Sequence, residues 1–334
     1  MASDGGGGAD EPLRTQEDGE GAVRGSGGLR AALVKTLISA IVMGVGAGLA
    51  VLGKGASAGA ALEPLTVMEM VAIIAFGIQI AAFVPAFVFQ TEKFYDLTGS
   101  LTYIVCGLYS FLAGPSALDD PEVTDVVATA LLLVWALRLG SFLFLRVTSS
   151  GGDDRFDAIK PDFLRFLLTW IIQGLWVFLT AYPVFIANAT RGSGDFGAVA
   201  VVGLVIWVLG FGIEVVADRQ KSTWRKDPAN RGKFIEYGLW YYSRHPNYLG
   251  EVTLWFGMFV LCSPDLSGTQ FASVISPVFV FCLIYFVSGV RLLEKKADSK
   301  WGGQPDYENY KANTSVFLLL PKGKKRTHDG NSAA

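Results

Sequence analysis

The sequence predicts an all-α protein, a polytopic transmembrane helical bundle with seven or eight spans, and two observations carry this prediction. Apolar residues gather in runs close to the length of helix that crosses the hydrocarbon core of a bilayer, which is about 20 residues. Only 17% of the 334 residues are charged, against about 25% in a typical soluble domain. The runs lack the short alternating segments of a membrane barrel, so helices are the structure that satisfies their backbone hydrogen bonds in lipid.

Eight apolar segments follow one another along the chain. The third and the seventh are short for a full crossing, which leaves the count at seven or eight. The expected spans cover residues 33–52, 68–90, 100–114, 124–147, 163–187, 198–217, 250–263 and 271–290. Residues 1–30 are glycine-rich with few large apolar side chains, so we expect a disordered tail there. Residues 321–334 are expected to form a second, basic disordered tail, which leaves 31–320 as one membrane bundle.

The distribution of Lys and Arg predicts on which side of the membrane each connector lies, because these residues are enriched in cytosolic loops. Segment 218–249 contains seven basic residues against three acidic ones, and the C-terminal segment is also rich in Lys and Arg. By contrast, the connector 115–123 carries acidic charges and no basic one. We therefore expect 218–249 and both termini on the cytosolic side.

Two other classes of site are not expected. The three cysteines, Cys106, Cys262 and Cys282, lie in or beside apolar runs without the spacing of metal ligands or of a disulfide framework. The formal net charge is −2, which provides no strong field to attract nucleic acid. We expect neither a metal nor a nucleic acid as a partner.

The residues that could carry chemistry concentrate after residue 210. Glu214, Asp218, Lys221 and Arg225 recur at i, i+4, i+7 and i+11, which places them on one face of one helix. A solvated helix end with ordinary ion pairs would show the same spacing. Glu214, however, lies within apolar sequence, where a charged side chain is costly and indicates a function by default.

The densest polar and aromatic segment runs from Leu239 to Glu251. A structural belt at the membrane interface would explain its Trp and Tyr residues, but not Arg244, His245 and Asn247. Arginine binds phosphate through paired hydrogen bonds, and aromatic rings stack on flat ligands. The segment therefore indicates a site for a nucleotide-type cofactor at the membrane surface.

A third segment follows the last span, and by itself it is typical of a basic helix that only fixes topology. Together, the three segments resemble the C-terminal catalytic region of the steroid 5-alpha-reductase (3-oxo-5-alpha-steroid 4-dehydrogenase) family, in the branch with a domain of unknown function similar to it. The motifs that carry the resemblance are ADRQ at 217–220, DPANRGK at 227–233, GLWYYSRHPNYLGE at 238–251, and an ending with Glu294, Tyr307, Tyr310 and Pro321. Looser anchors are FYD at 94–96 and WALRLG at 135–140.

The resemblance implies an endoplasmic-reticulum membrane reductase that uses NADPH to reduce a C=C bond conjugated to a carbonyl in a lipophilic, steroid- or lipid-like substrate. It places the substrate among the spans of 33–147 and the cofactor within 198–310. The cofactor residues implied are Glu214, Asp218, Arg225, Arg244, His245, Asn247, Tyr248, Glu251, Arg291 and Tyr307. The catalytic candidates are Asp96, Tyr103 and Arg138.

Two alternatives stay open at the level of the sequence. Membrane methyltransferases of the isoprenylcysteine carboxyl type share the Arg-His-Pro-x-Tyr-x-Gly element and a similar tail, and their cofactor is S-adenosylmethionine. Asn247, Glu251 and the motif at 227–233 look more like a reductase. A non-catalytic transporter or scaffold could also keep the fold, with Glu69, Arg138 and Glu214 as a polar pathway.

Overall fold

The computed structural model describes residues 35–36, 38–40, 42–51, 66–115, 121–192 and 196–322. Within these residues the secondary structure is helical, apart from an isolated parallel bridge between Ser243 and Ser315. The tails expected to be disordered, 1–30 and nearly all of 321–334, lie outside the described residues. The all-α prediction is therefore confirmed for the part of the chain that forms the bundle.

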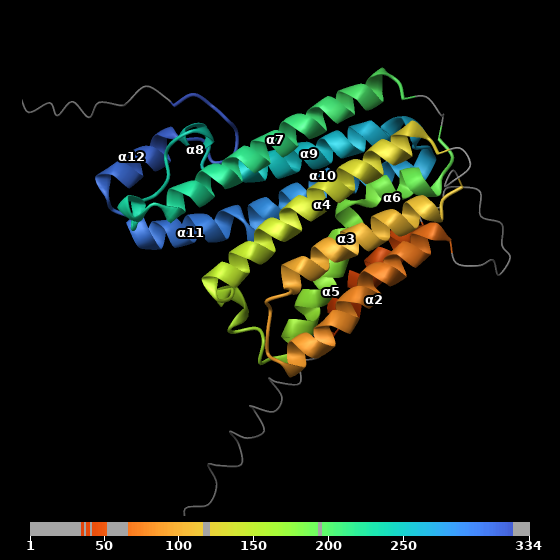
Figure 1. Cartoon of the computed structure of the whole chain (residues 1–334), viewed down its shortest axis with the longest axis horizontal. Helices are drawn as coiled ribbons and strands as arrows, with labels where there is room; N and C mark the ends of the chain where they lie inside the picture. The colour runs from red at the N-terminus through yellow and green to blue at the C-terminus, as the bar shows by residue number, and fades with distance from the viewer. Residues whose placement is uncertain are drawn as a thin grey trace, which may run out of the picture.

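Eleven α-helices are described in the bundle and its outer end (Figure 1). They are α2 (Val67–Val88), α3 (Tyr95–Leu112), α4 (Val123–Ser150), α5 (Phe163–Thr180), α6 (Tyr182–Ala189), α7 (Ala198–Lys226), α8 (Leu239–Tyr242), α9 (Pro246–Cys262), α10 (Ile275–Cys282), α11 (Val290–Trp301) and α12 (Pro305–Asn313). Short 3₁₀ turns cover Asp154–Phe156, Pro228–Asn230, Ser263–Asp265 and Gly268–Val274, and a π-helix covers Leu283–Ser288.

Five of the described helical segments are long and apolar enough to cross a bilayer, so the chain is an integral membrane protein. They are α2, α4, α5, α7 and the continuous segment Gly268–Trp301. A further apolar helix, Ile38–Val51, is described in part, and α9 has only 17 residues. Five spans are thus supported, and the larger count of seven or eight stays a prediction.

Two of the expected spans have a different internal structure. The span expected at 163–187 is divided into α5 and α6 at Ala181, because Pro183 in the first turn of α6 has no N–H to continue the ladder. The span expected at 271–290 changes from a 3₁₀ turn through α10 to a π-helix before α11 begins. Hydropathy reports the length of an apolar segment but not these breaks.

Helix α7 continues well beyond the expected end of its span at residue 217. It runs unbroken to Lys226, so Glu214, Asp218, Lys221 and Arg225 lie on one helix, as their spacing predicts. In Figure 1, α8, α11 and α12 gather around this polar end of α7. The bundle therefore has one elaborated end, built from the C-terminal third of the chain.

The backbones of α7 and α9 touch, because glycines face each other along their whole contact. A Cβ atom on Gly257 of α9 would lie 2.4 Å from the backbone nitrogen of Trp207, and one on Gly210 of α7 would lie 2.4 Å from that of Leu254. Small residues at this contact permit the close approach that stabilises helix pairs in lipid. Figure 1 shows the two helices side by side.

We expect Gly257→Ala to destabilise the protein by about 1–3 kcal/mol or more, since the added methyl group forces two backbones apart. The matched control is Gly212→Ala on α7, where an added Cβ meets nothing within 4 Å. That change should be neutral or stabilising, by up to about 1 kcal/mol, because alanine favours helix more than glycine does. Thermal unfolding in detergent measures both variants, and equal melting temperatures would contradict the packing argument.

Candidate active site

Arg138 links two helices through a pair of buried carboxylates. It lies on α4, and its guanidinium donates hydrogen bonds to Glu214 and to Asp218, one turn apart on α7. Both acids are buried, and Arg138 itself is only 19% exposed. A buried charge is stable only when it is paired and hydrogen-bonded, so this triad fixes α4 against α7 inside the bundle.

Helix α9 adds two further polar side chains to the triad. The Asn247 amide nitrogen donates to Asp218 over 3.2 Å, whereas its carbonyl oxygen is buried without a partner among the described residues. Glu251 follows one turn later and lies within electrostatic range of Glu214, Asp218 and Arg138. Arg138, Glu214, Asp218, Asn247 and Glu251 together form the central polar cluster.

Two features of the central polar cluster indicate that it can accept a ligand. Within the described part of the chain, the half-buried Glu251 has no hydrogen-bond or ion-pair partner, and the second oxygen of Glu214 has the Trp135 indole as a neighbour but makes no well-formed hydrogen bond. Such groups are costly to bury unless something pairs with them. Gly250 brings the cluster together, because a Cβ there would lie 2.6 Å from the backbone nitrogen of Glu214.

Three aromatic side chains form a wall beside the central polar cluster. Trp135 packs edge-on against Tyr103 and Trp255, with ring centroids 5.0 and 4.8 Å away. This aromatic triad (Tyr103, Trp135 and Trp255) is almost fully buried, and Trp135 precedes Arg138 by one turn just as Trp255 follows Glu251. The Tyr103 hydroxyl has the Thr180 hydroxyl as a neighbour but makes no well-formed hydrogen bond within the described residues. The apolar wall therefore contains a donor whose hydrogen bond is not satisfied by good geometry.

Basic residues surround the outer end of the cluster. Arg146, two turns beyond Arg138 on α4, lies within electrostatic range of Lys221 and Arg225 on α7. Arg155, in the connector between α4 and α5, lies within electrostatic range of Asp96 and Tyr248. Arg146, Arg155, Lys221 and Arg225 are called the basic rim below. Their charges come from two helices and a loop, so only the fold brings them together.

Tyr248 connects the basic rim with the central polar cluster. Its hydroxyl lies within electrostatic range of Arg146 and Arg155 on one side and of Asp218 and Glu251 on the other. Its ring stacks on His245 with centroids 5.7 Å apart. An aromatic ring at the boundary between positive and negative side chains is suited to a ligand that is anionic at one end and polar at the other.

His245 and Arg244 hold the loop before α9 against α11. Arg244 pairs with Glu294, and the His245 Nε2 lies 2.8 Å from the other carboxylate oxygen of Glu294. Burial lowers the pKa of His245, and the nearby Glu294 only partly opposes this effect. A neutral His245 donates a hydrogen bond from Nε2 to the Glu294 carboxylate. Its buried Nδ1 is then an acceptor without a partner among the described residues.

The loop that carries these residues is fixed to α7. The Trp240 indole donates to the Ala217 carbonyl over 3.1 Å, and the Gln220 side chain accepts from the Leu239 N–H over 3.0 Å. Gly238, in the turn before α8, has φ 63° and packs against Gln220, a conformation and a space that only glycine fits. The loop is therefore a rigid platform rather than a free surface segment.

The structure brings together most of the residues expected to bind the cofactor. Glu214, Asp218, Asn247 and Glu251 lie in the central polar cluster, Tyr248 lies beside it, and Arg225 lies on the exposed end of the same helix. His245 and Arg244 are linked to the cluster through the same loop. Arg291 lies on α11, and Tyr307 on α12 donates to Asp298 over 2.9 Å. Within the described residues, neither is hydrogen-bonded or ion-paired to the central polar cluster.

The three catalytic candidates do not share one place. Tyr103 and Arg138 both lie at the cluster, Tyr103 in its aromatic wall and Arg138 at its centre. Asp96 lies in the first turn of α3, 3.9 Å from Arg146, seven residues from Tyr103 and so about 10 Å away along the helix axis. Asp96 thus belongs to the outer, basic end.

Some residues of the site were not among the cofactor and catalytic residues that the resemblance implied. Lys221 shares the helix face of Glu214 and Asp218, and this spacing was a usable signal. Glu294 is a charge on the motif-bearing last helix. Trp135 opens the WALRLG motif at 135–140, which marked the segment but not the role of the ring. Trp255, Arg146 and Arg155 had no such signal, because apolar helices and basic span ends are common throughout the chain. Among the described residues, no group of three or more His, Cys, Asp or Glu side chains could hold a metal ion.

Comparison with known proteins identifies relatives but no solved structure that matches. An uncharacterized protein of Schizosaccharomyces pombe is 26% identical over 181 residues, 48% of this chain and 50% of that protein. A protein named Delta(14)-sterol reductase from Gibberella zeae is 32% identical over 128 residues, 32% of this chain and 24% of its own length. The chain thus spans about half of the first relative and a quarter of the second. No solved structure matches the sequence.

A family model covers the site as a whole. The model described as "Protein of unknown function (DUF1295)" matches residues 82–314, a range that begins in α2 and ends just after α12. It includes the central polar cluster, the aromatic triad and the basic rim. The expected domain of unknown function is thus present, and the chain belongs to the DUF1295 family. The resemblance to the steroid reductases is supported only by the partial match to the protein named as a sterol reductase.

Proposed function

We propose that this protein is a membrane-embedded reductase that uses NADPH to reduce a C=C bond conjugated to a carbonyl in a lipophilic, steroid- or lipid-like substrate. One observation carries the proposal: a buried polar cluster with unpaired atoms lies between a basic rim and an aromatic wall that contains a hydroxyl without a well-formed hydrogen bond among the described residues. The distant relative named as a sterol reductase supports the same class of chemistry.

The side chains present fit a dinucleotide phosphate better than the alternatives. The basic rim suits phosphate groups, and the unpaired Asn247 carbonyl and Glu251 carboxyl suit ribose hydroxyls or an amide. S-adenosylmethionine, the cofactor of the methyltransferase alternative, carries no phosphate and would leave the rim unused. We propose that Asp218, Arg225, Asn247, Tyr248 and Glu251 hold NADPH, which supplies a hydride when bound.

The chain itself supplies position and electrostatic stabilisation. Negative charge develops on the carbonyl oxygen of a conjugated substrate as its β-carbon is reduced, and Tyr103 can donate a hydrogen bond to that oxygen. Trp135 and Trp255 exclude water from the Tyr103 hydroxyl, which strengthens the hydrogen bond. The spans of 33–147, which contain Tyr103 and Arg138, are the proposed substrate side.

The proposed orientation follows from the supply of cofactor. We place the end formed by α8, α11 and α12, and with it the basic rim, on the cytosolic side, where NADPH is available (Figure 1). This agrees with the excess of Lys and Arg in 218–249. An endoplasmic-reticulum location is part of the same proposal, by analogy with the reductase family that the motifs resemble.

Ligand-induced thermal stabilisation tests the proposal directly. The protein purified in detergent is expected to melt higher with NADPH than with NADH or S-adenosylmethionine, because a ligand that binds only the native state stabilises it. Asn247→Ala should abolish the effect, whereas Asn313→Ala, at a half-buried position on α12 whose amide bonds only locally to Asn309, should retain it. Stabilisation by S-adenosylmethionine alone would contradict the reductase proposal and favour a methyltransferase.

If NADPH stabilises the protein, lipid extracts can be incubated with protein and NADPH. The substrate would be identified as a lipid whose mass increases by two hydrogens.

A further inference from the structure

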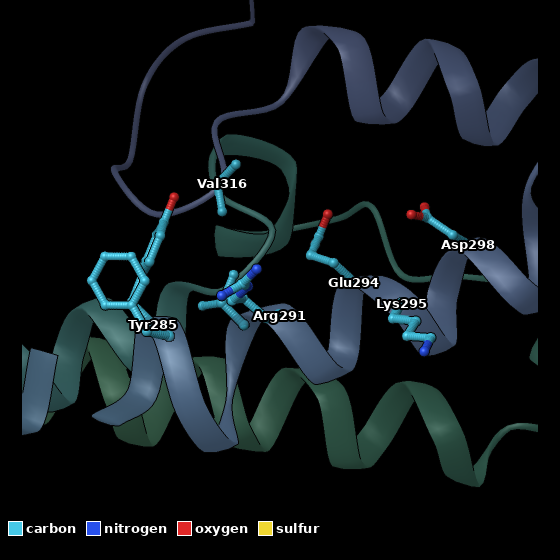
Figure 2. Close-up of a pocket in the computed structure, with 8 residues that line it drawn as sticks. Tyr285, Arg291, Glu294, Lys295, Asp298 and Val316 are labelled. Carbon is cyan, nitrogen blue, oxygen red and sulfur yellow. The ribbon is translucent and has the colours of Figure 1, made fainter. Parts of the chain in front are cut away.

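A pocket of about 610 Å³ lies against α11 at the elaborated end of the bundle (Figure 2). One part of its lining is apolar and comes from Tyr285, Phe286 and Val290 and from Val316 of the C-terminal segment. The other part carries Arg291 and Lys295, one turn apart on α11. An apolar wall joined to a pair of cations matches an amphiphilic ligand with an anionic head.

The positive charge of this pocket is not neutralised by its own acids. Glu294 also lines the pocket, but it pairs with Arg244 and His245. The second acid in the lining, Asp298, pairs with Lys311. Within the described residues, neither Arg291 nor Lys295 has an acidic partner. Two unpaired cations are therefore left for a ligand.

The surroundings of the pocket identify the body of the ligand. The pocket lies where the apolar segment Gly268–Trp301 passes from apolar to charged sequence, the position of a membrane interface. Phe286 and Val287 are 51% and 62% exposed, so the chain next to the pocket presents apolar side chains to lipid. A soluble phosphate would use the cations only, whereas a lipid would use both surfaces.

We propose that this pocket binds the phosphate headgroup of an anionic membrane lipid, with Arg291 and Lys295 on the phosphate and the acyl chains along Phe286 and Val287. Basic pockets between membrane helices bind such headgroups by charge. The proposal is independent of the reductase function. It gives Arg291 a ligand other than the cofactor that the sequence resemblance implied.

The C-terminal segment completes the pocket and is held in place by the backbone. The Arg244 N–H donates to the Ser315 carbonyl over 2.8 Å, and the Ser243 hydroxyl donates to that of Phe317 over 2.8 Å. Val316 lies between these two anchors and faces α11 in Figure 2. The pocket is thus a fixed feature rather than a chance space beside a loose tail.

Native mass spectrometry of the full chain from nanodiscs tests the proposal, with phosphatidic acid and phosphatidylcholine as the probes. We expect the wild type to retain phosphatidic acid selectively, and R291Q/K295Q to bind it about 30-fold more weakly, since each basic side chain contributes about 1 kcal/mol to such binding. The matched control is R231Q/K233Q, the same charge change at two exposed loop positions. It should bind like the wild type.

Three results would overturn the lipid site. The first is that the wild type shows no preference for phosphatidic acid over phosphatidylcholine, a result that the wild-type measurement alone can give. Glycerol phosphate could compete as well as the intact lipid, which would make the ligand a soluble phosphate. NADPH could displace the lipid while R291Q/K295Q loses NADPH-induced stabilisation, which would return Arg291 to the cofactor site. If NADPH has no effect on any variant and lipid selectivity persists, the reductase proposal fails and the lipid site stands.

Discussion

Arg138→Met is expected to destabilise the protein by about 3–5 kcal/mol, because it leaves Glu214 and Asp218 buried without their cation. Methionine keeps most of the side-chain volume, so the loss reflects charge rather than a cavity. Unfolding in mixed detergent micelles measures the change. NADPH-induced stabilisation should vanish as well, since the central polar cluster loses its centre.

A compensated variant separates the charge from the shape. In R138M/E214Q/D218N the unpaired charges are removed together, and most of the lost stability should return, because replacing a whole buried ionic group by neutral groups costs little. Arg165→Met is the surface control, since its side chain is exposed and its guanidinium donates to the Ala158 carbonyl over 3.2 Å. A triple variant no more stable than Arg138→Met would show that the arginine acts through packing.

Tyr103→Phe is expected to lower the turnover of a conjugated substrate by about 10²–10³-fold, because it removes the donor proposed to stabilise the developing oxyanion. The ring keeps its contacts with Trp135 and Trp255, so folding and NADPH-induced stabilisation should be unchanged. Single-turnover oxidation of NADPH in the presence of substrate gives the rate of the chemical step.

The matched control for this substitution lies on the same helix. Tyr109 is partly buried on α3, and Tyr109→Phe should retain the wild-type rate. Full activity in Tyr103→Phe would exclude its hydroxyl from the reaction. A loss of NADPH-induced stabilisation in the same variant would assign Tyr103 to the cofactor instead.

Much of the fold could be predicted from the sequence, because the cost of placing a segment in lipid depends mainly on the segment itself. The apolar runs at 68–90, 124–147 and 198–217 correspond to α2, α4 and α7. The break at Ala181 and the π-helix at Leu283–Ser288 could not be predicted in this way. They depend on local backbone geometry, which does not change hydropathy.

The candidate site could be predicted in part. A helical period alone placed Glu214 and Asp218 on one face, and the density of polar residues after Leu239 indicated the loop that carries His245 and Asn247. The same reasoning could not distinguish Arg291, which lies apart on α11, from the residues of the cluster. Spacing along one element is visible in a sequence, whereas a contact between elements is not.

The sequence by itself determined that this chain is a helical membrane protein and which of its segments carry unusual polar residues. Only the tertiary structure decided which residues meet. Arg138 reaches Glu214 across 76 positions of sequence, and Tyr103 meets Trp135 and Trp255 from three different helices. The physical reason is that the free energies of helix formation and of transfer into lipid are sums over the residues of one segment, so they can be estimated from the sequence of that segment. Pairing of buried charges depends instead on how α4, α7 and α9 pack, and the facing glycines of α7 and α9 set that distance.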